Sequence, residues 1–494
     1  MTEPINGEVD RIGTVQSPAP RITATALADL LGYWSAHDGP LYRLLATRIG
    51  RLADTAELPP GLRLPPERDL AAVLSVSRNT VAMAYQSLRD EGMADSRQGS
   101  GTRIVPHQTT PAAVHRANGF FARLLSSAEV EADLTMATVD CAPQVAAALD
   151  DPTALLSAAQ RRAVITSTGY FPYGYPDLRA AIAATLTTRH GVPTRPAEVI
   201  VTTGAQQALD LLVRCELGPG QPALVESPTF SGMLDALHRA GARPVGVPPG
   251  DLDRLERAIT AHRPGLAYLI TTHQNPVGLS LPLDARQRVV ALARAHPDVV
   301  IIDDLANSPV TFTGTAPPPP LAALARNTPN LVTVGSLSKA YWGGLRVGWV
   351  RATDGIIARL AAAKAATDLG STAYQQAIVA ALMTRCDEEI LRWRAEWLRP
   401  RYEAISTALR ACLPDWRWTP PDGGLTIWAR LPDSWGGDSG GFAQAALRQG
   451  VAVVPGRLLS ATADPDDAAR HVRLAFTQPP GTLTAAIKTL ASIA

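Results

Sequence analysis

The chain has 494 residues, 46% of them hydrophobic, and a formal net charge of +1 at pH 7. This length suggests two or three domains, and the hydrophobic fraction is enough for a large core, which excludes a disordered or fibrous protein. The nearly balanced charge excludes a basic field over the whole molecule. Any contact with nucleic acid must therefore come from a local surface.

The cysteines and apolar runs bear on cellular compartment. Cys141, Cys215, Cys386 and Cys412 are widely separated and form no C-x-x-C pair, which argues against a disulfide framework or a zinc site. We expect a reducing cytoplasm and no metal. No apolar run reaches the ~18 residues of a membrane span, and the start of the chain lacks a signal-like stretch, so we expect neither export nor membrane insertion.

Four segments can be separated along the chain. Residues 1–22 are rich in proline, glycine and polar side chains and are predicted to be a disordered tail. Residues 23–105 carry a compact, mainly helical pattern that ends in a glycine-rich hairpin signal. Residues 106–130 contain proline, threonine and alanine without periodicity, which is typical of a linker. The remainder, 131–494, is predicted to be a second and larger domain.

Two consecutive helices in the first domain have helix-turn-helix spacing. One begins at Pro65-Pro66-Glu67, and the next follows Ser77, a favourable N-cap residue. In the second helix Val81, Tyr85 and Leu88 are spaced to form a buried face, which leaves its first turn polar and exposed. A first turn of this kind can face base edges, while hydroxyls and arginines bind phosphates.

A polar turn with two glycines follows, in the segment Arg97–Arg103, as a β-wing would require. The alternative is an ordinary helical hairpin with solvated arginines. The segments Leu58–Ala71 and Ser77–Val81, together with the wing, resemble the GntR family of winged helix-turn-helix proteins. This resemblance implies binding to double-stranded DNA. The residues that it implies lie at the DNA are Arg68, Ser77, Arg78, Asn79, Thr80, Arg97, Gly99 and Gly101.

The second domain alternates apolar, β-rich runs with helical stretches. Such runs occur at 199–201, 267–270, 299–302 and 331–334. This alternation predicts an α/β domain with a mostly parallel sheet. The first run leads into Gly204-Ala205-Gln206, where a glycine turn and a helix start would offer free amides to an anion.

Lys339 is one of only three lysines in the chain, and Arg346 follows it by seven positions. An amine that forms a Schiff base must lose its proton near neutral pH, which burial favours, and a neighbouring arginine can hold a phosphate. Together they indicate a pyridoxal phosphate site. The alternative is a solvated lysine after a strand.

Other side chains at strand ends suit the same cofactor. Phe230 could stack on a flat ring, and Asn275 supplies an amide. Asp303 and Asp304 end a strand, where a carboxylate would keep a pyridine nitrogen protonated. The choice between them stays open, although Asp303 is favoured because it follows the apolar strand directly.

These features, in this order, resemble a fold-type-I aminotransferase domain with a smaller C-terminal α+β part. The resemblance implies a Schiff base at Lys339 and pairing of Asp303 with the pyridine nitrogen. It assigns Arg473 to the α-carboxylate of an amino acid. The residues that it implies contact the cofactor are Gly204, Ala205, Gln206, Phe230, Asn275, Asp303, Ser336, Ser338, Lys339 and Arg346.

One position departs from the aminotransferase pattern. The family usually has a tyrosine two or three residues after the pyridine aspartate, and this chain has Leu305 and Ala306 there. A donor to the ring oxygen is therefore missing, which makes efficient transamination less favourable while leaving cofactor binding intact.

A GntR-type domain joined to an aminotransferase-like domain is similar to the MocR-type transcription regulators. This resemblance implies a cytoplasmic homodimer whose DNA binding changes when an amino acid or pyridoxal phosphate itself acts at the Lys339 aldimine. The alternative is an active aminotransferase that carries an accessory DNA-binding module.

Overall fold

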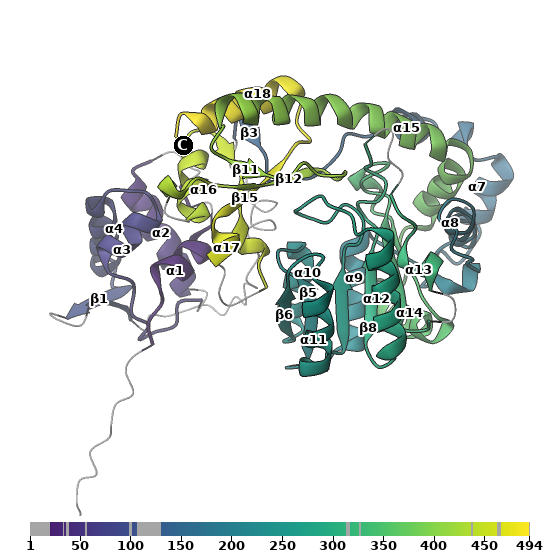
Figure 1. The fold of residues 1–494 in the computed structure, drawn as a ribbon, viewed down its shortest axis with the longest axis horizontal. Coiled ribbons are helices and arrows are strands. Elements are labelled where there is room, and N and C mark those ends of the chain that lie inside the picture. The colour runs from purple at the N-terminus through teal and green to yellow at the C-terminus, as the bar shows by residue number, and fades with distance from the viewer. Residues whose placement is uncertain are drawn as a thin grey trace, which may run out of the picture. The chain divides into compact units, whose positions relative to one another are not determined.

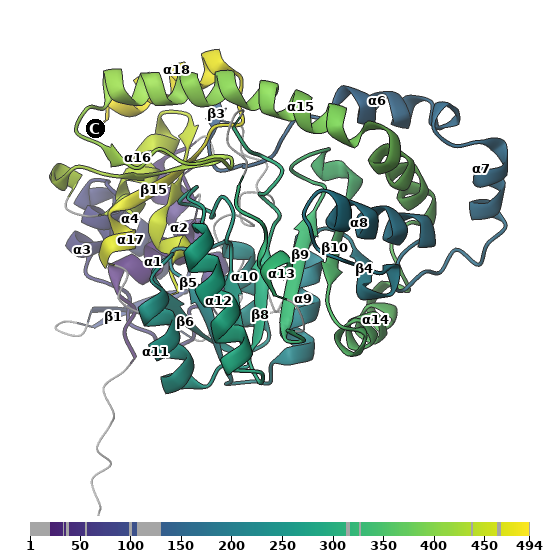
Figure 2. The same cartoon turned by 45° about the vertical axis from the view of Figure 1, so that its right-hand side comes forward.

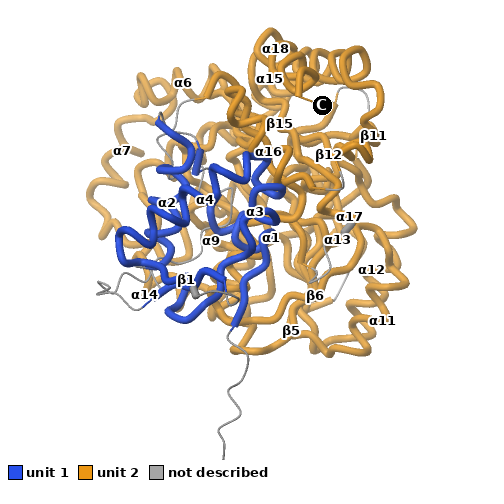
Figure 3. Tube along the Cα trace, turned by 90° about the vertical axis from the view of Figure 1, so that its left-hand side faces the viewer, with its two compact units in different colours: residues 1–114 blue, residues 115–494 orange. Residues whose placement is uncertain are grey.

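The structure is a computed structural model. It describes residues 20–32, 34–35, 39–54, 57–97, 101–105, 130–312, 317–325, 328–435, 438–461 and 466–493. The chain forms two compact units, 1–114 and 115–494 (Figure 3). Residues 106–129 of the predicted linker and 1–19 of the predicted tail lie outside the described residues.

The first unit has four helices and a two-stranded antiparallel sheet among its described residues. They are α1 (Ala24–Leu31), α2 (Leu41–Asp54), α3 (Glu67–Val73), α4 (Arg78–Asp90), β1 (Ala94–Arg97) and β2 (Gly101–Ile104). The strands pair from Ala94 opposite Ile104 to Arg97 opposite Gly101. This is the predicted helix pair followed by a β-hairpin.

Apolar faces of these helices form a separate core, in which Val81, Tyr85 and Leu88 are buried as the spacing predicted. The Tyr85 hydroxyl donates a hydrogen bond to Pro65 O at 3.0 Å and so ties α4 to the start of α3. Residues 20–22 pair with Arg63 through two backbone hydrogen bonds. The ordered domain therefore begins before residue 23.

The second unit is built on a large sheet, of which Figure 1 labels β5, β6 and β8. The sheet has seven strands in the order β4-β10-β9-β8-β7-β5-β6. Its strands are β4 (Val199–Thr202), β5 (Pro222–Glu226), β6 (Arg243–Val247), β7 (Leu266–Leu269), β8 (Val300–Asp304), β9 (Leu331–Ser336) and β10 (Gly348–Arg351). Only β10 runs antiparallel to its neighbours. The prediction of a mostly parallel sheet is confirmed.

Successive buried side chains along each strand point to opposite faces of the sheet, and helices cover both faces. One face packs on α9 (Ala205–Glu216), α10 (Ser231–Arg239) and α14 (Asp354–Asp368). The other packs on α6 (Pro143–Asp150), α7 (Ala158–Ile165), α8 (Pro176–Thr188), α11 (Leu252–His262), α12 (Leu283–Ala295), α13 (Leu321–Leu324) and the start of α15 (Ala373–Cys412). Figure 2 shows α6 and α7 at one end of this second layer.

A smaller α+β part surrounds the second half of α15 and has its own core. It contains β3 (Ala132–Asp133), β11 (Arg417–Trp418), β12 (Thr426–Arg430), α16 (Ser439–Arg448), β13 (Val451–Ala452), β14 (Val454–Pro455), α17 (Asp466–Ala469), β15 (His471–Ala475) and α18 (Pro480–Ala491). Its four-stranded sheet has the order β11-β12-β15-β14, and β3 pairs separately with β13. Residues just after the linker thus close onto the C-terminal part.

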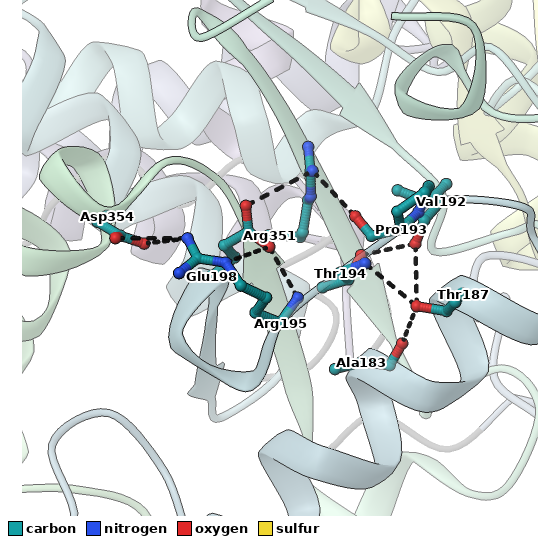
Figure 4. A network of polar contacts seen from close by, with 9 residues as sticks. All are labelled: Ala183, Thr187, Val192, Pro193, Thr194, Arg195, Glu198, Arg351 and Asp354. Atoms are coloured by element: carbon teal, nitrogen blue, oxygen red, sulfur yellow. Dashed lines mark hydrogen bonds and ion pairs between the residues drawn. The ribbon is translucent and has the colours of Figure 1, made fainter. Parts of the chain in front are cut away.

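A polar network fixes the chain where it enters β4 (Figure 4). Arg195 pairs with Asp354, and its backbone N–H donates to Glu198 at 2.7 Å. Arg351 of the neighbouring β10 donates to Pro193 O at 3.4 Å. These bonds set the register of β4, whose other end carries Gly204.

No helix in the described part of the chain combines the length and the apolar character needed to cross a membrane. Nor do the described residues hold a group of three or more His, Cys, Asp or Glu side chains arranged for a metal ion.

Candidate functional site

The predicted site residues of the second unit gather at one edge of the large sheet. The strands β4, β5, β7, β8 and β9 run parallel, so their carboxyl ends meet there. Gly204, Phe230, Asn275, Asp304 and Lys339 all lie at or just after these ends. This is the edge at which open α/β sheets bind ligands.

The turn between β4 and α9 forms a cradle for an anion. Gly204 has φ +100°, and no side chain caps the first turn of α9. The guanidinium of Arg346 reaches this turn: it donates to Thr203 O, and a Cβ placed on Gly204 would lie 3.0 Å from its Nη2. Uncapped amides, a helix dipole and a guanidinium together fit a phosphate group.

Three buried polar atoms beside this cradle have no hydrogen-bond partner among the described residues: Gln206 Oε1, Thr229 Oγ1 and Ser231 Oγ. The Nε2 of Gln206 donates to Gly232 O at 2.8 Å. A Cβ on Gly232 would lie 2.0 Å from Gln206 Oε1 and 2.5 Å from the Phe230 ring, so the glycine lets both approach. Because buried polar atoms are rarely left unpaired, this group indicates a ligand between Phe230 and the cradle.

Lys339 follows β9 in a loop whose turn is held by a bond from Ser338 N to Ser336 Oγ at 3.1 Å. Its side chain is partly buried, and its Nζ donates to Ala137 O. Burial lowers the pKa of Lys339 to about 8, the Arg473 guanidinium acts in the same direction, and Asp304 opposes both. About a tenth of the amine is therefore neutral at pH 7, compared with about one part in three thousand for an ordinary lysine.

Arg473 lies in β15 of the smaller part, and its side chain is almost completely buried. Its Nη2 donates to Thr135 O at 2.6 Å, and its Nη1 donates to Asn275 Oδ1 at 3.5 Å. The structure thus brings Lys339, Asn275 and Arg473 together from segments far apart in the sequence. A buried guanidinium beside a reactive amine can bind the carboxylate of an amino acid.

The family model "Aminotransferase class I and II" matches residues 142–490, which is more than half of the chain. The chain belongs to this family. A second model, of the gntR family of bacterial regulatory proteins, matches residues 41–104. The chain therefore combines a GntR domain with a class I and II aminotransferase domain, as predicted.

Relatives with a similar organisation include the uncharacterized HTH-type transcriptional regulator YisV of Bacillus subtilis. It is 28% identical over 85% of this chain and 89% of its own length. The probable rhizopine catabolism regulatory protein MocR of Rhizobium meliloti is 31% identical over 63% of this chain and 65% of its own. The predicted architecture of a MocR-type regulator is confirmed.

Among solved structures, the α-aminoadipate aminotransferase LysN of Thermus thermophilus has a TM-score of 0.67 at 30% identity. The match covers 76% of this chain and 93% of that one. The LysN structure is a complex with N-(5'-phosphopyridoxyl)-L-leucine. The fold and the residues described above fit pyridoxal phosphate. That Gly204, Ala205, Gln206, Ser336, Ser338 and Arg346 contact its phosphate stays a prediction.

The two neighbouring aspartates face opposite sides of β8. Asp304 accepts hydrogen bonds from the Tyr268 hydroxyl at 2.7 Å and from Ala306 N at 2.8 Å, and its charge acts on Lys339. Asp303 instead accepts from Thr271 Oγ1 at 2.6 Å and Leu321 N at 2.9 Å. Both side chains are buried in the sheet. The sequence favoured Asp303 for the cofactor, whereas this geometry favours Asp304.

A buried carboxyl that the sequence analysis did not single out, Glu226, ends β5 beside these aspartates. Its Oε2 accepts from Ile270 N at 2.9 Å and from Gln274 Nε2 at 3.3 Å. Burial raises the pKa of Glu226 to about 8 and that of Asp304 to about 6. The only available signal was its place at the end of an apolar strand.

A second unpredicted group supports the phosphate cradle from behind. Lys364 of α14 is fully buried and donates to Gln207 Oε1 at 3.1 Å, Asp368 Oδ2 at 2.7 Å and Ser371 Oγ at 3.1 Å. Gln207 Oε1 also accepts from Thr203 N at 2.9 Å. This network holds the turn before Gly204 in place.

In the first unit, four of the predicted DNA-binding residues, Ser77 to Thr80, lie at the start of α4, and Arg68 lies in α3. Ser77 Oγ accepts from Thr80 N at 3.1 Å as an N-cap, and Arg68 and Asn79 are exposed. Arg78, with 74% of its side chain exposed, pairs with Glu67 at 3.2 Å. Gly101 opens β2 with φ +73°, while Gly99 and the side chain of Arg97 lie outside the described residues.

The charges around Lys339 predict a titration that can be measured directly. In cofactor-free protein labelled with ¹³Cε-lysine, the Lys339 resonance should titrate near pH 8, far below an ordinary lysine. Arg473→Gln removes a repelling positive charge and should move the midpoint up. The Lys339 resonance is assigned as the one, of three lysine resonances, that is absent from Lys339→Arg. A midpoint above pH 10 in the native chain would contradict a buried environment for Lys339.

The same titration separates the aspartates. Asp304→Asn removes the charge that stabilises the ammonium form and should move the Lys339 midpoint down. Asp303→Asn should leave it unchanged and instead lower the melting temperature, because an amide cannot accept both bonds that Asp303 accepts. We also expect Asp304→Asn to weaken pyridoxal phosphate binding about tenfold. The reverse pattern would return the cofactor role to Asp303.

Proposed function

We propose that the protein is a pyridoxal phosphate-dependent, DNA-binding transcription regulator, in which a small molecule acting at Lys339 changes the affinity for DNA. The observation that carries this proposal is the presence, in one chain, of a buried amine with a lowered pKa beside Arg473 and of a GntR domain. The amine can react with a ligand. The GntR domain can bind DNA.

Different side chains at the sheet edge would bind different parts of the cofactor. Arg346 and the first turn of α9 would hold the phosphate, Phe230 would cover one face of the ring, and Asp304 would face the ring nitrogen. When bound, pyridoxal phosphate supplies an electrophilic carbon for primary amines and an electron sink. Arg473 would bind the carboxylate of an amino acid, which gives this site a preference for amino acids over simple amines.

Regulation is favoured over sustained turnover by the residues after the aspartates. The positions two or three residues after Asp303 or Asp304 are Leu305, Ala306 and Asn307, which carry no hydroxyl, whereas the family usually has a tyrosine there. Leu305 is buried and its backbone N–H donates to Val334 O at 2.8 Å, so the backbone at this position continues the sheet. Loss of the donor weakens catalysis more than binding.

The second candidate function is an aminotransferase with an accessory DNA-binding domain. It is favoured by the completeness of the rest of the site, since Lys339, Asn275, Arg346 and Arg473 all occupy positions suited to that chemistry. An effector of the regulator could be an amino acid, for which Arg473 argues, or pyridoxal phosphate itself. Turnover of an added amino acid to its keto acid would favour the enzyme.

A homodimer and a cytoplasmic location form part of the proposal. Tyr170 and Tyr173 are 65% and 42% exposed in the segment before α8, although large aromatic side chains are usually buried. Such a segment is suited to meeting a second copy of the chain. Two copies would present two GntR domains, as paired half-sites in DNA require.

The DNA contact can be tested on a duplex taken from upstream of the protein's own gene. Arg78→Ala should weaken binding about tenfold or more, because an exposed arginine at the start of a recognition helix contacts phosphate or base. Arg89→Ala, in the last turn of the same helix, is the matched control and should change little. Equal affinity of Arg78→Ala and native protein would contradict the proposed DNA surface.

The ligand effect needs its own comparison. Amino acids should change the DNA affinity of the native protein carrying pyridoxal phosphate but not that of Lys339→Ala, and the absorbance of the bound cofactor should change only in the former. A keto acid accumulating with no change in DNA affinity would establish the second candidate function instead.

A further inference from the structure

A pocket of the aminotransferase unit shares with the predicted cofactor contacts one lining residue, Ser336, and otherwise lies apart from them. It has a volume of about 790 Å³ and lies between α8, α15 and the end of β9. Its apolar walls include Leu186, Leu305, Phe312, Trp349 and Met383. None of Gly204, Arg346, Lys339 or Arg473 lines it.

The pocket lies on the opposite face of the sheet from the anion cradle. Trp349 packs in the core that contains α8 and α15, whereas its neighbour Val350 packs with α9 and α14. Because successive strand residues face opposite sides, the sheet separates the two sites. The turn from Ser336 to Tyr341, which carries Lys339, borders both.

One end of the pocket is charged. Asp387 accepts a hydrogen bond from the Tyr341 hydroxyl at 2.6 Å and pairs with Arg189 through Nη1. The Nε and Nη2 groups of Arg189 have no partner among the residues that the structure describes, and the side chain is 32% exposed. One arm of the guanidinium is thus fixed, and the other can bind an anion.

A polar hollow of about 770 Å³ adjoins this end and shares Thr185, Arg189, Met383 and Asp387 with the apolar pocket. The Arg189–Asp387 pair therefore lies at the boundary between the apolar pocket and the polar hollow. A ligand that fits this arrangement has an apolar body and one charged end.

We propose that this pocket binds an apolar carboxylic acid, with its hydrocarbon or aromatic body between α8 and α15 and its carboxylate on Arg189. The volume falls within the range of small-molecule sites, which are mostly apolar with a few polar groups that fix orientation. Of the residues that line the apolar pocket, Arg189 is the one with a guanidinium, and Asp387 disfavours an anion on its own side of that group, so the free side of Arg189 orients the carboxylate. This inference does not depend on the proposed regulatory function.

Isothermal titration with octanoate and octan-1-ol tests the site. Octanoate should bind the native protein in a one-to-one ratio per chain. Arg189→Gln should weaken octanoate about tenfold while leaving octan-1-ol unchanged, because only the carboxylate uses the guanidinium. Ser308→Phe, which places a ring in the pocket, should abolish binding of both.

Two control variants separate this site from other sources of affinity. Arg288 lies on the surface of α12 and, like Arg189, pairs with an aspartate, here Asp253. Arg288→Gln should not change octanoate binding. Arg473→Gln should not change it either, and saturation with pyridoxal phosphate should not displace octanoate. Loss of binding in Arg473→Gln, displacement by the cofactor, no binding at all, or equal affinity of the Arg189 variant and native protein would each overturn the proposal.

Discussion

The burial of one amine beside one guanidinium is the constraint on which the rest of the aminotransferase unit depends. Lys339 and Arg473 are both cations, and each makes the charged state of the other less favourable in a site with little water. Arginine keeps its proton under such conditions, so the lysine becomes the group that loses it. Hydrogen bonds from the Lys339 and Arg473 side chains to the backbone carbonyls of Ala137 and Thr135 hold both in place. The fold therefore has to bring a loop after β9, a strand of the smaller part and the segment after β3 to one point.

Much of this arrangement could be predicted from sequence. The apolar runs at 267–270 and 331–334, the glycine turn at Gly204 and the N-cap at Ser77 are local signals, and each formed the element it predicted. The choice between Asp303 and Asp304 was different, because it depends on which face of β8 each side chain occupies. That face is set by pairing of β8 with β7 and β9, which no local pattern records. Glu226 and Lys364 were missed for a similar reason: Ile270, which binds Glu226, and Gln207, which links Lys364 to the turn before Gly204, are more than forty residues away.

The missing tyrosine links the chemistry of the site to the architecture of the sheet. Leu305 and Ala306 occupy the positions where the family usually has it, and Leu305 lines the apolar pocket. A tyrosine hydroxyl at one of these two positions would serve a cofactor, whereas the aliphatic side chain of Leu305 extends an apolar wall. The substitution thus removes a hydrogen-bond donor from the cofactor site and adds apolar surface to the pocket. In the proposed regulator, whose ligand needs to be bound and not converted, this exchange costs little.

The turn from Ser336 to Tyr341 borders both the Lys339 site and the apolar pocket. Lys339 belongs to this turn and faces Arg473, while Leu337, Ala340 and Tyr341 line the apolar pocket. Tyr341 is fully buried and is bound to Asp387, and the backbone carbonyls of Ala340 and Tyr341 accept hydrogen bonds from Arg394. A ligand that displaced Tyr341 or its aspartate would have to move the same short segment that positions the reactive amine. Coupling between two sites requires a shared element whose arrangement both can bias, and the segment that these two sites share is this six-residue turn.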